Sequence, residues 1–133
     1  MKLLLFMGLW WLGAVTGDEQ PRNGQGRVVI YRQREFGGNS YDLKINDKKL
    51  GSLPTNRYLE IEVPPGRVKL ESVKDYFSEN RTLWLSVQAG HTYYVKAVEE
   101  VDFLSRSLLM APIAEEQAQR ELNRLKPARP SSH

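Results

Sequence analysis

The sequence contains no cysteine among its 133 residues. Disulfides, thiolate metal sites, a cysteine nucleophile and a cysteine-linked lipid anchor are therefore excluded. Histidine is nearly as scarce, with only His91 and His133. The patterns of common enzyme sites, such as a Gly-x-Ser-x-Gly elbow, a phosphate-binding loop or zinc-ligand spacing, are missing too. These absences favour a non-enzymatic protein with no metal and no other cofactor.

An excess of one charge is also missing from the main part of the chain. The net charge is +3, but Lys2 lies in the amino-terminal segment, and Arg124, Lys126 and Arg129 lie near the carboxyl end. The remainder holds 15 basic and 16 acidic residues. Nucleic-acid-binding proteins usually carry a basic stripe. The balance therefore gives no reason to expect a nucleic-acid partner.

Only one long hydrophobic run occurs, from Leu3 to Leu12, between a single lysine and several small residues. This layout is typical of a secretory signal peptide. A helix through this run and the small residues would be about 22 Å long, too short for the roughly 30 Å hydrocarbon core of a bilayer. We therefore expect a signal peptide over residues 1–17, cleaved between Gly17 and Asp18, and a periplasmic or secreted product without a membrane span. An uncleaved anchor, with the two adjacent tryptophans at the membrane interface, is the alternative.

After a polar entry segment, residues 18–26, the sequence consists of short stretches in which apolar and polar residues alternate. Such alternation predicts half-buried β-strands, here about seven of them. We expect the apolar side chains to share one core, formed by Val28, Ile30, Leu43, Ile45, Leu59, Ile61, Val63, Val68, Leu70, Leu83, Leu85, Val87, Val95, Ala97 and Leu122.

Two turns between these predicted strands are clearly recognisable. The segment beginning Asn46-Asp47 is typical of a hairpin turn. Pro65-Gly66 separates two alternating runs, and proline followed by glycine suits the two central positions of a type II turn. We therefore expect a second hairpin, in which the strands on either side of Pro65-Gly66 are neighbours.

The spacing of the apolar residues changes only in the segment from Ala114 to Leu125. Ala118, Leu122 and Leu125 recur at i, i+4 and i+7, which predicts one helix. Residues 126–133 contain little that could be buried, so they are expected to be disordered. Strands followed by one helix predict a single all-β domain over residues 27–125, an antiparallel β-sandwich with the helix at one end or edge.

Several segments together resemble an exported bacterial family called domain of unknown function 2846. The likeness runs from Gly26 to Leu125, and its most specific segments are LGSL at 50–53, VPPG at 63–66 and AGHTYYV at 89–95. The resemblance implies a small β-sandwich of transthyretin-like or carboxypeptidase-regulatory-like type. Many members look like lipoproteins, and this chain departs from them because it lacks the cysteine. The resemblance carries over no functional residue.

Aromatic residues on the predicted strands are the main candidates for a binding face. Tyr58, Trp84 and Tyr94, or its neighbour Tyr93, should project from the side opposite the alternating aliphatic residues. An exposed row of this kind could bind another protein or stack on sugar rings. Alternatively, the helix or the entry segment covers this face.

Polar candidates are weaker. His91 follows a glycine in a turn and has no recognisable partners for metal binding or proton transfer, so a solvent-facing role is favoured. Glu60 and Glu62 should lie on one strand face, with Glu71 on the neighbouring strand, an arrangement that could imitate the carboxylates of a glycoside hydrolase. The solvent-facing side of a sheet is the favoured explanation for these glutamates.

The sequence thus predicts a non-enzymatic, exported β-sandwich that acts as an adaptor and binds an envelope protein or a glycan. A carbohydrate-binding module that uses the exposed aromatics is the first alternative. A hydrolase built on the glutamates is the second.

Overall fold

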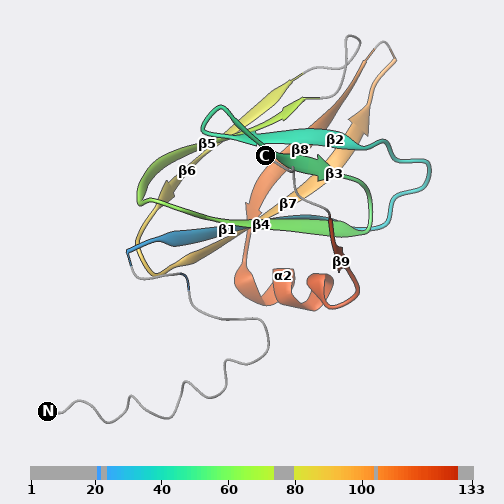
Figure 1. The fold of residues 1–133 in the computed structure, drawn as a ribbon. Helices are drawn as coiled ribbons and strands as arrows, with labels where there is room; N and C mark the ends of the chain where they lie inside the picture. Colours follow the sequence, from blue (N-terminus) through green and yellow to red (C-terminus); the bar gives the residue numbers. More distant parts are fainter. Residues whose placement is uncertain (1–20, 22–23, 74–79, 104, 129–133) are drawn as a thin grey trace, which may run out of the picture.

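The computed structural model describes residues 21, 24–73, 80–103 and 105–128, which form a sandwich of two sheets with one helix (Figure 1). The five-stranded sheet has the order β8-β7-β1-β4-β9, with β1 (Gly26–Arg32), β4 (Arg57–Val63), β7 (Thr92–Val101), β8 (Arg106–Ile113) and β9 (Lys126–Pro127). The four-stranded sheet has the order β3-β2-β5-β6, with β2 (Tyr41–Ile45), β3 (Lys48–Leu53), β5 (Gly66–Val73) and β6 (Arg81–Val87). The helix, α2, spans Glu115–Leu122. The signal-peptide prediction lies outside the described residues.

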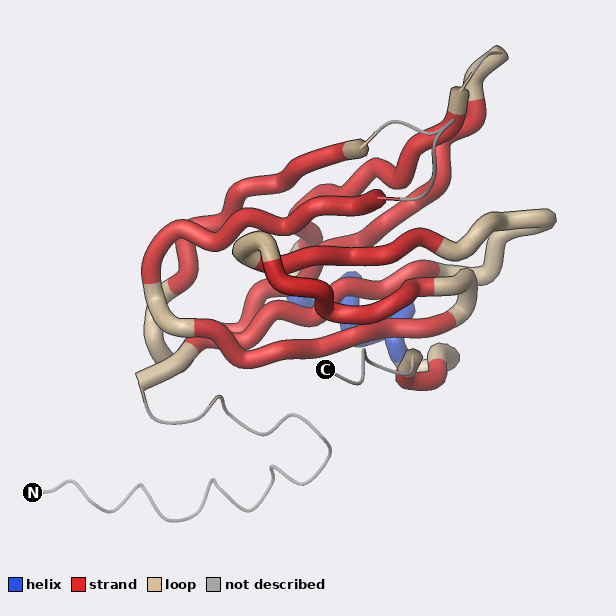
Figure 2. The backbone as a smooth tube through the Cα atoms, turned by 45° about the horizontal axis from the view of Figure 1, so that its top comes forward, coloured by secondary structure: helices blue, strands red, loops and turns tan. Residues whose placement is uncertain are grey.

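The core lies between the two layers, where the alternation predicts it (Figure 2). Most of the expected residues are buried there, while Ile61 and Leu83 are partly buried against the cluster. Leu122 is not part of this core, because it lies on the helix outside the five-stranded sheet. The core also contains residues that the alternation did not single out: Tyr41, Leu50, Leu53, Leu108 and Ala128.

The first predicted hairpin is confirmed. Strands β2 and β3 pair antiparallel around Asn46 and Asp47, whose φ angles are 50° and 70°. Positive φ at both central residues is the geometry of a type I′ turn, which matches the right-handed twist of the two strands.

The second predicted hairpin is wrong. The chain does reverse at Pro65-Gly66, and Gly66 has a φ of 126°, which favours glycine. However, β4 pairs with β1, whereas β5 pairs with β2 and β6, so the corner joins the two sheets. Residues Leu59, Val63, Val68 and Leu70 therefore face one another across the core rather than along one sheet.

The helix covers part of the outer face of the five-stranded sheet, on the side away from β2, β3 and β5 (Figure 1). Ala118 is fully buried beneath it, and Val29 and Tyr31 of β1 are buried although they point away from the core. Just after the helix, β9 pairs in parallel with β4, and Ala128 is 9% exposed. The expected disorder from residue 126 onward is therefore wrong for residues 126–128.

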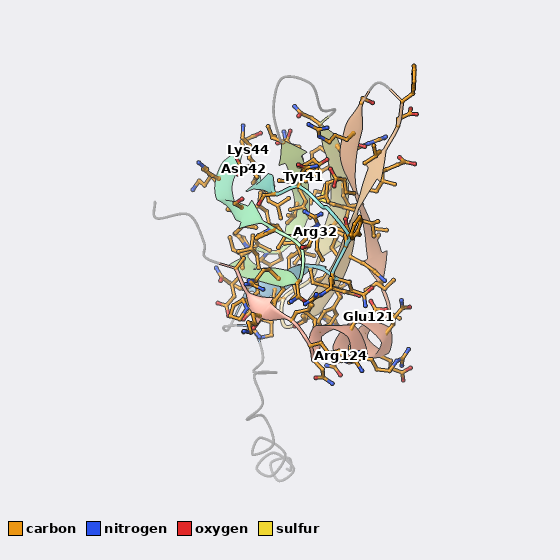
Figure 3. The ribbon with its side chains drawn as sticks, turned by 90° about the vertical axis from the view of Figure 1, so that its right-hand side faces the viewer. Arg32, Tyr41, Asp42, Lys44, Glu121 and Arg124 are labelled. Atoms are coloured by element: carbon orange, nitrogen blue, oxygen red, sulfur yellow. The ribbon has the colours of Figure 1, made fainter. Side chains whose placement is uncertain are left out.

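A buried arginine closes one end of the sandwich. Arg32 points inward from β1, donates a hydrogen bond to the Leu53 carbonyl at 2.9 Å, and forms an ion pair with Glu35 at 3.0 Å. Its guanidinium also lies 5.7 Å from the centre of the Tyr41 ring. Figure 3 shows Arg32 and Tyr41 inside the molecule. Because a buried charge needs such partners, the start of the β1–β2 connection is held against the sheet.

Candidate binding site

A groove of about 1060 Å³ lies between α2 and the outer face of the five-stranded sheet, and we call it the helix groove. Its floor comes from β1, β4 and β7, its wall from α2, and one end from the Gly90-His91 turn. It is larger than a second hollow that α2 also borders. Its position makes it the candidate binding site.

The register of the three floor strands determines which side chains meet. Tyr94, Val29 and Glu60 lie side by side on β7, β1 and β4, because Val29 is opposite Tyr94 on one side and Glu60 on the other. Alternate residues of a strand share a face. The next outward row is therefore Lys96, Tyr31 and Tyr58.

The second row fastens the helix. The Tyr31 hydroxyl donates a 2.6 Å hydrogen bond to Glu121 Oε1, and Lys96 Nζ lies 3.1 Å from the same oxygen. Burial, and then the hydrogen bond to Glu121, raises the pKa of Tyr31, so its hydroxyl remains a donor. The hydrogen bond from Tyr31 is the main cause that lowers the pKa of Glu121, with smaller contributions from Gln117 and Lys96. The first row forms the groove floor, together with Tyr58 of the second row.

The groove combines aromatic rings with more acidic than basic side chains. Tyr58 and Tyr94 are partly exposed, while Glu60 on the floor and Glu115 and Glu116 on the wall are exposed. Arg27, at the edge of the floor, forms an ion pair with Glu62 at 3.1 Å. The surface therefore offers apolar contact, carboxylates and hydrogen-bonding groups to a ligand.

The structure brings together two of the three predicted aromatic residues. Tyr58 and Tyr94 both line the helix groove, on β4 and β7. Trp84 does not join them, because β6 belongs to the other sheet, where Trp84 is 50% exposed. The Arg67 guanidinium lies 4.4 Å from the centre of its ring and occupies one face of the indole. Tyr93 points to the other side of β7, and its hydroxyl accepts a hydrogen bond from the Gln88 amide at 2.8 Å.

The polar candidates are not assembled into a catalytic arrangement. Glu60 and Glu62 do share the outer face of β4, but Glu71 is on β5 in the opposite sheet, 3.8 Å from Lys69. His91 lines one end of the groove, with Nδ1 3.2 Å from the Ala89 carbonyl. Within the described ranges, no three acidic or histidine side chains are grouped as metal ligands. Among the same residues, no helix is long and apolar enough to cross a bilayer.

Sequence reasoning missed the residues that create the groove, above all Val29, Tyr31 and Glu121. A usable signal was present for the first two. Residues 28–31 are VVIY, an apolar run without alternation, which is typical of a strand buried on both faces. Glu121 carries no such signal, because a glutamate on a short helix is normally assigned to its solvent-facing side.

A comparison with models of protein families finds a match. The family model described as "Protein of unknown function (DUF2846)" matches residues 22–106, which include the floor strands of the groove but not α2. No curated protein and no solved structure matches the chain.

Proposed function

We propose a function for this chain, which belongs to the family described as Protein of unknown function (DUF2846), from its helix groove. The protein is a non-enzymatic, exported adaptor that binds an extended segment of an envelope protein in this groove. The amino-terminal sequence, with its single lysine and its apolar run, supports export. The observation that carries the proposal is the groove itself, with Tyr58 and Tyr94 on its floor.

The size and shape of the groove favour an elongated ligand. Small-molecule pockets usually have volumes of about 300–1,000 Å³ and enclose most of the ligand. The helix groove has about 1060 Å³ and runs along a helix and across three strands. Tyrosines suit such a surface because each supplies a large apolar area at small conformational cost and keeps a polar end.

The charges of the groove favour a partner segment with basic residues. The groove is lined by Glu60, Glu115 and Glu116, and its basic residues are Arg120 and an Arg27 that is already paired with Glu62. Opposite charges across an interface accelerate association and select the partner more than they raise affinity. We therefore expect salt to weaken the complex mainly through slower association.

The glutamates predicted as a hydrolase site, Glu60, Glu62 and Glu71, do not meet at one cleft, which favours binding over hydrolysis by that set. Glycoside hydrolases need two carboxyl groups on either side of one cleft. Here Glu62 is in an ion pair with Arg27, and Glu71 faces away on the other sheet.

Site-specific photocrosslinking tests the proposal. A photoreactive phenylalanine analogue replaces Tyr58 or Tyr94 in the groove, and Trp84 on the opposite sheet in the control. In intact cells we expect the two groove positions to give the same envelope-protein adduct and the control position to give none. If the groove positions give no adduct beyond the control, the adaptor proposal is wrong.

A carbohydrate-binding module is the second candidate, because the same two tyrosines lie beside Glu60 and the Gln119 amide. Trp84 is less suited to sugar stacking, since Arg67 occupies one face of its indole. Glycan-array binding that is lost in Tyr94→Ala and kept in Trp84→Ala would favour this alternative over a protein partner.

A further inference from the structure

We propose that a second hollow, on the other side of α2, is a binding site for a phosphate group. This hollow has a volume of about 610 Å³ and is lined by residues from the start of the β1–β2 connection, the β3–β4 turn and the end of the helix. We call it the arginine pocket, because Arg34, Arg120 and Arg124 line it together with Gln33 and Asn56.

The positive charge of the arginine pocket is not neutralised from within. All three arginines are exposed, and none forms an ion pair with another residue in the described part of the chain. Glu121 is the one carboxylate in the pocket lining, and it already binds Tyr31 and Lys96. Figure 3 shows Glu121 on the helix and Arg124 just after it, both below the strands, with Glu121 on the side toward the strands.

Helix stability alone explains only part of this cluster. Arg120 lies in the last turn of α2 and Arg124 just beyond its end, where the partial negative charge of the helix favours cations. The same reason does not apply to Arg34, which comes from the other end of the sequence and brings a third like charge to the pocket. Three like charges around one hollow repel one another. A bound anion would remove this repulsion.

The backbone around the pocket is fixed before any ligand binds. The Asn56 amide donates a hydrogen bond to the Gln33 carbonyl at 3.3 Å, and the Asn56 carbonyl accepts one from the Lys126 amide at 3.5 Å. Arg34 lies between the buried Arg32 and Glu35, and these two neighbours form an ion pair with each other. Arg34 is therefore anchored directly after β1, while Arg120 lies on α2 and Arg124 just beyond its end.

The chemistry of the side chains indicates the ligand class. Guanidinium groups bind phosphate oxygens through two parallel hydrogen bonds, and side-chain amides can satisfy the remaining oxygens. Three guanidinium groups exceed what a single carboxylate would need. Free phosphate and the phosphate of a lipid headgroup share this chemistry, and the experiment distinguishes them.

The test compares Arg34→Gln with Arg67→Gln. Arg34 does not line the helix groove, so this variant leaves the adaptor proposal untouched, and Arg67→Gln removes the same charge from the opposite sheet. Binding of inorganic phosphate is followed by calorimetry. Binding of phosphatidylcholine vesicles, with and without phosphatidylglycerol, is followed by flotation. Urea midpoints are measured for both variants to confirm that each one folds.

We expect saturable binding to at least one probe, weakened about tenfold in Arg34→Gln and unchanged in Arg67→Gln. Phosphate binding without flotation identifies a soluble ligand, whereas flotation that requires phosphatidylglycerol identifies a headgroup. If both variants lose binding equally, general charge attraction explains it and the proposal is wrong. Absence of binding to both probes contradicts it as well.

Discussion

The outer faces of the two sheets differ, although most strands of both sheets alternate apolar and polar residues. On the five-stranded sheet, Val29 and Tyr31 are buried beneath α2. On the four-stranded sheet, Asp42 and Lys44 project outward (Figure 3), and Trp84 is half-exposed. A strand with one polar face needs a packing partner only on its apolar face. β1 is apolar on both faces and needs a packing partner on each. The helix is the second packing partner, and the groove lies where it does not pack closely against the sheet.

Deleting one aromatic side chain on each face gives the largest expected difference. Tyr31 is fully buried, so Tyr31→Ala should lower the free energy of unfolding by about 3–5 kcal/mol through lost packing. Trp84→Ala should cost about 1 kcal/mol or less, since it removes a half-exposed ring and a surface contact with Arg67. Urea unfolding of both variants measures the difference, and similar losses would contradict the assignment of a covered and an open face.

Removing the charge of Glu121 should have an intermediate, pH-dependent effect. Its pKa is lowered in the folded protein from a starting value of 4.5, mainly by the hydrogen bond from Tyr31. The carboxylate therefore stabilises the fold fully above that value, and the stabilisation is lost as the pH falls through the lower folded pKa. Glu121→Gln should cost about 1 kcal/mol at neutral pH.

Urea unfolding across the acidic range checks this effect. The difference between the parent protein and Glu121→Gln should shrink as the pH drops below about 4. Glu116→Gln, exposed on the same helix, is the matched control and should follow the parent throughout. A difference for Glu121→Gln that stays constant with pH would mean that the ionised carboxylate does not fasten the helix.

The smallest effect is expected at a charge pair on the open face. Asp47 lies 2.8 Å from Lys69, whose hydrogen bond lowers the pKa of Asp47. Because the pair is in contact with water, side-chain entropy and screening offset most of its attraction. Asp47→Asn should leave the urea midpoint at the parent value, and a clear loss would show that this face contributes more to stability than its exposure suggests.

Much of the fold follows from local patterns. Alternation identified β2 and β4 to β7 and most of the core, and the Asn46-Asp47 pair identified one hairpin. The pattern says which side chains share a face, but not which sheet a strand joins. This is why the Pro65-Gly66 corner was assigned to a hairpin although it crosses between layers. The parallel pairing of β9 with β4 has no local signal, since Pro127 is a poor strand residue.

The candidate site was predictable only in part. The alternation placed Tyr58 and Tyr94 on the outer side of their strands, and both line the groove. It could not separate Trp84 from them, because outward-facing residues of the two sheets show the same period. The arginine pocket had no signal in the sequence, as Arg34 and Arg124 meet only through the tertiary fold.

The order in which the chain emerges during synthesis gives the helix a further meaning. β1 is made before every other strand of the sandwich, yet α2, which covers its outer face, follows β8. Until α2 has been made, Val29 and Tyr31 therefore remain exposed to water. Completion of the fold is thus coupled to the arrival of residues 115–122, and a chain that stopped before them would keep an exposed apolar surface.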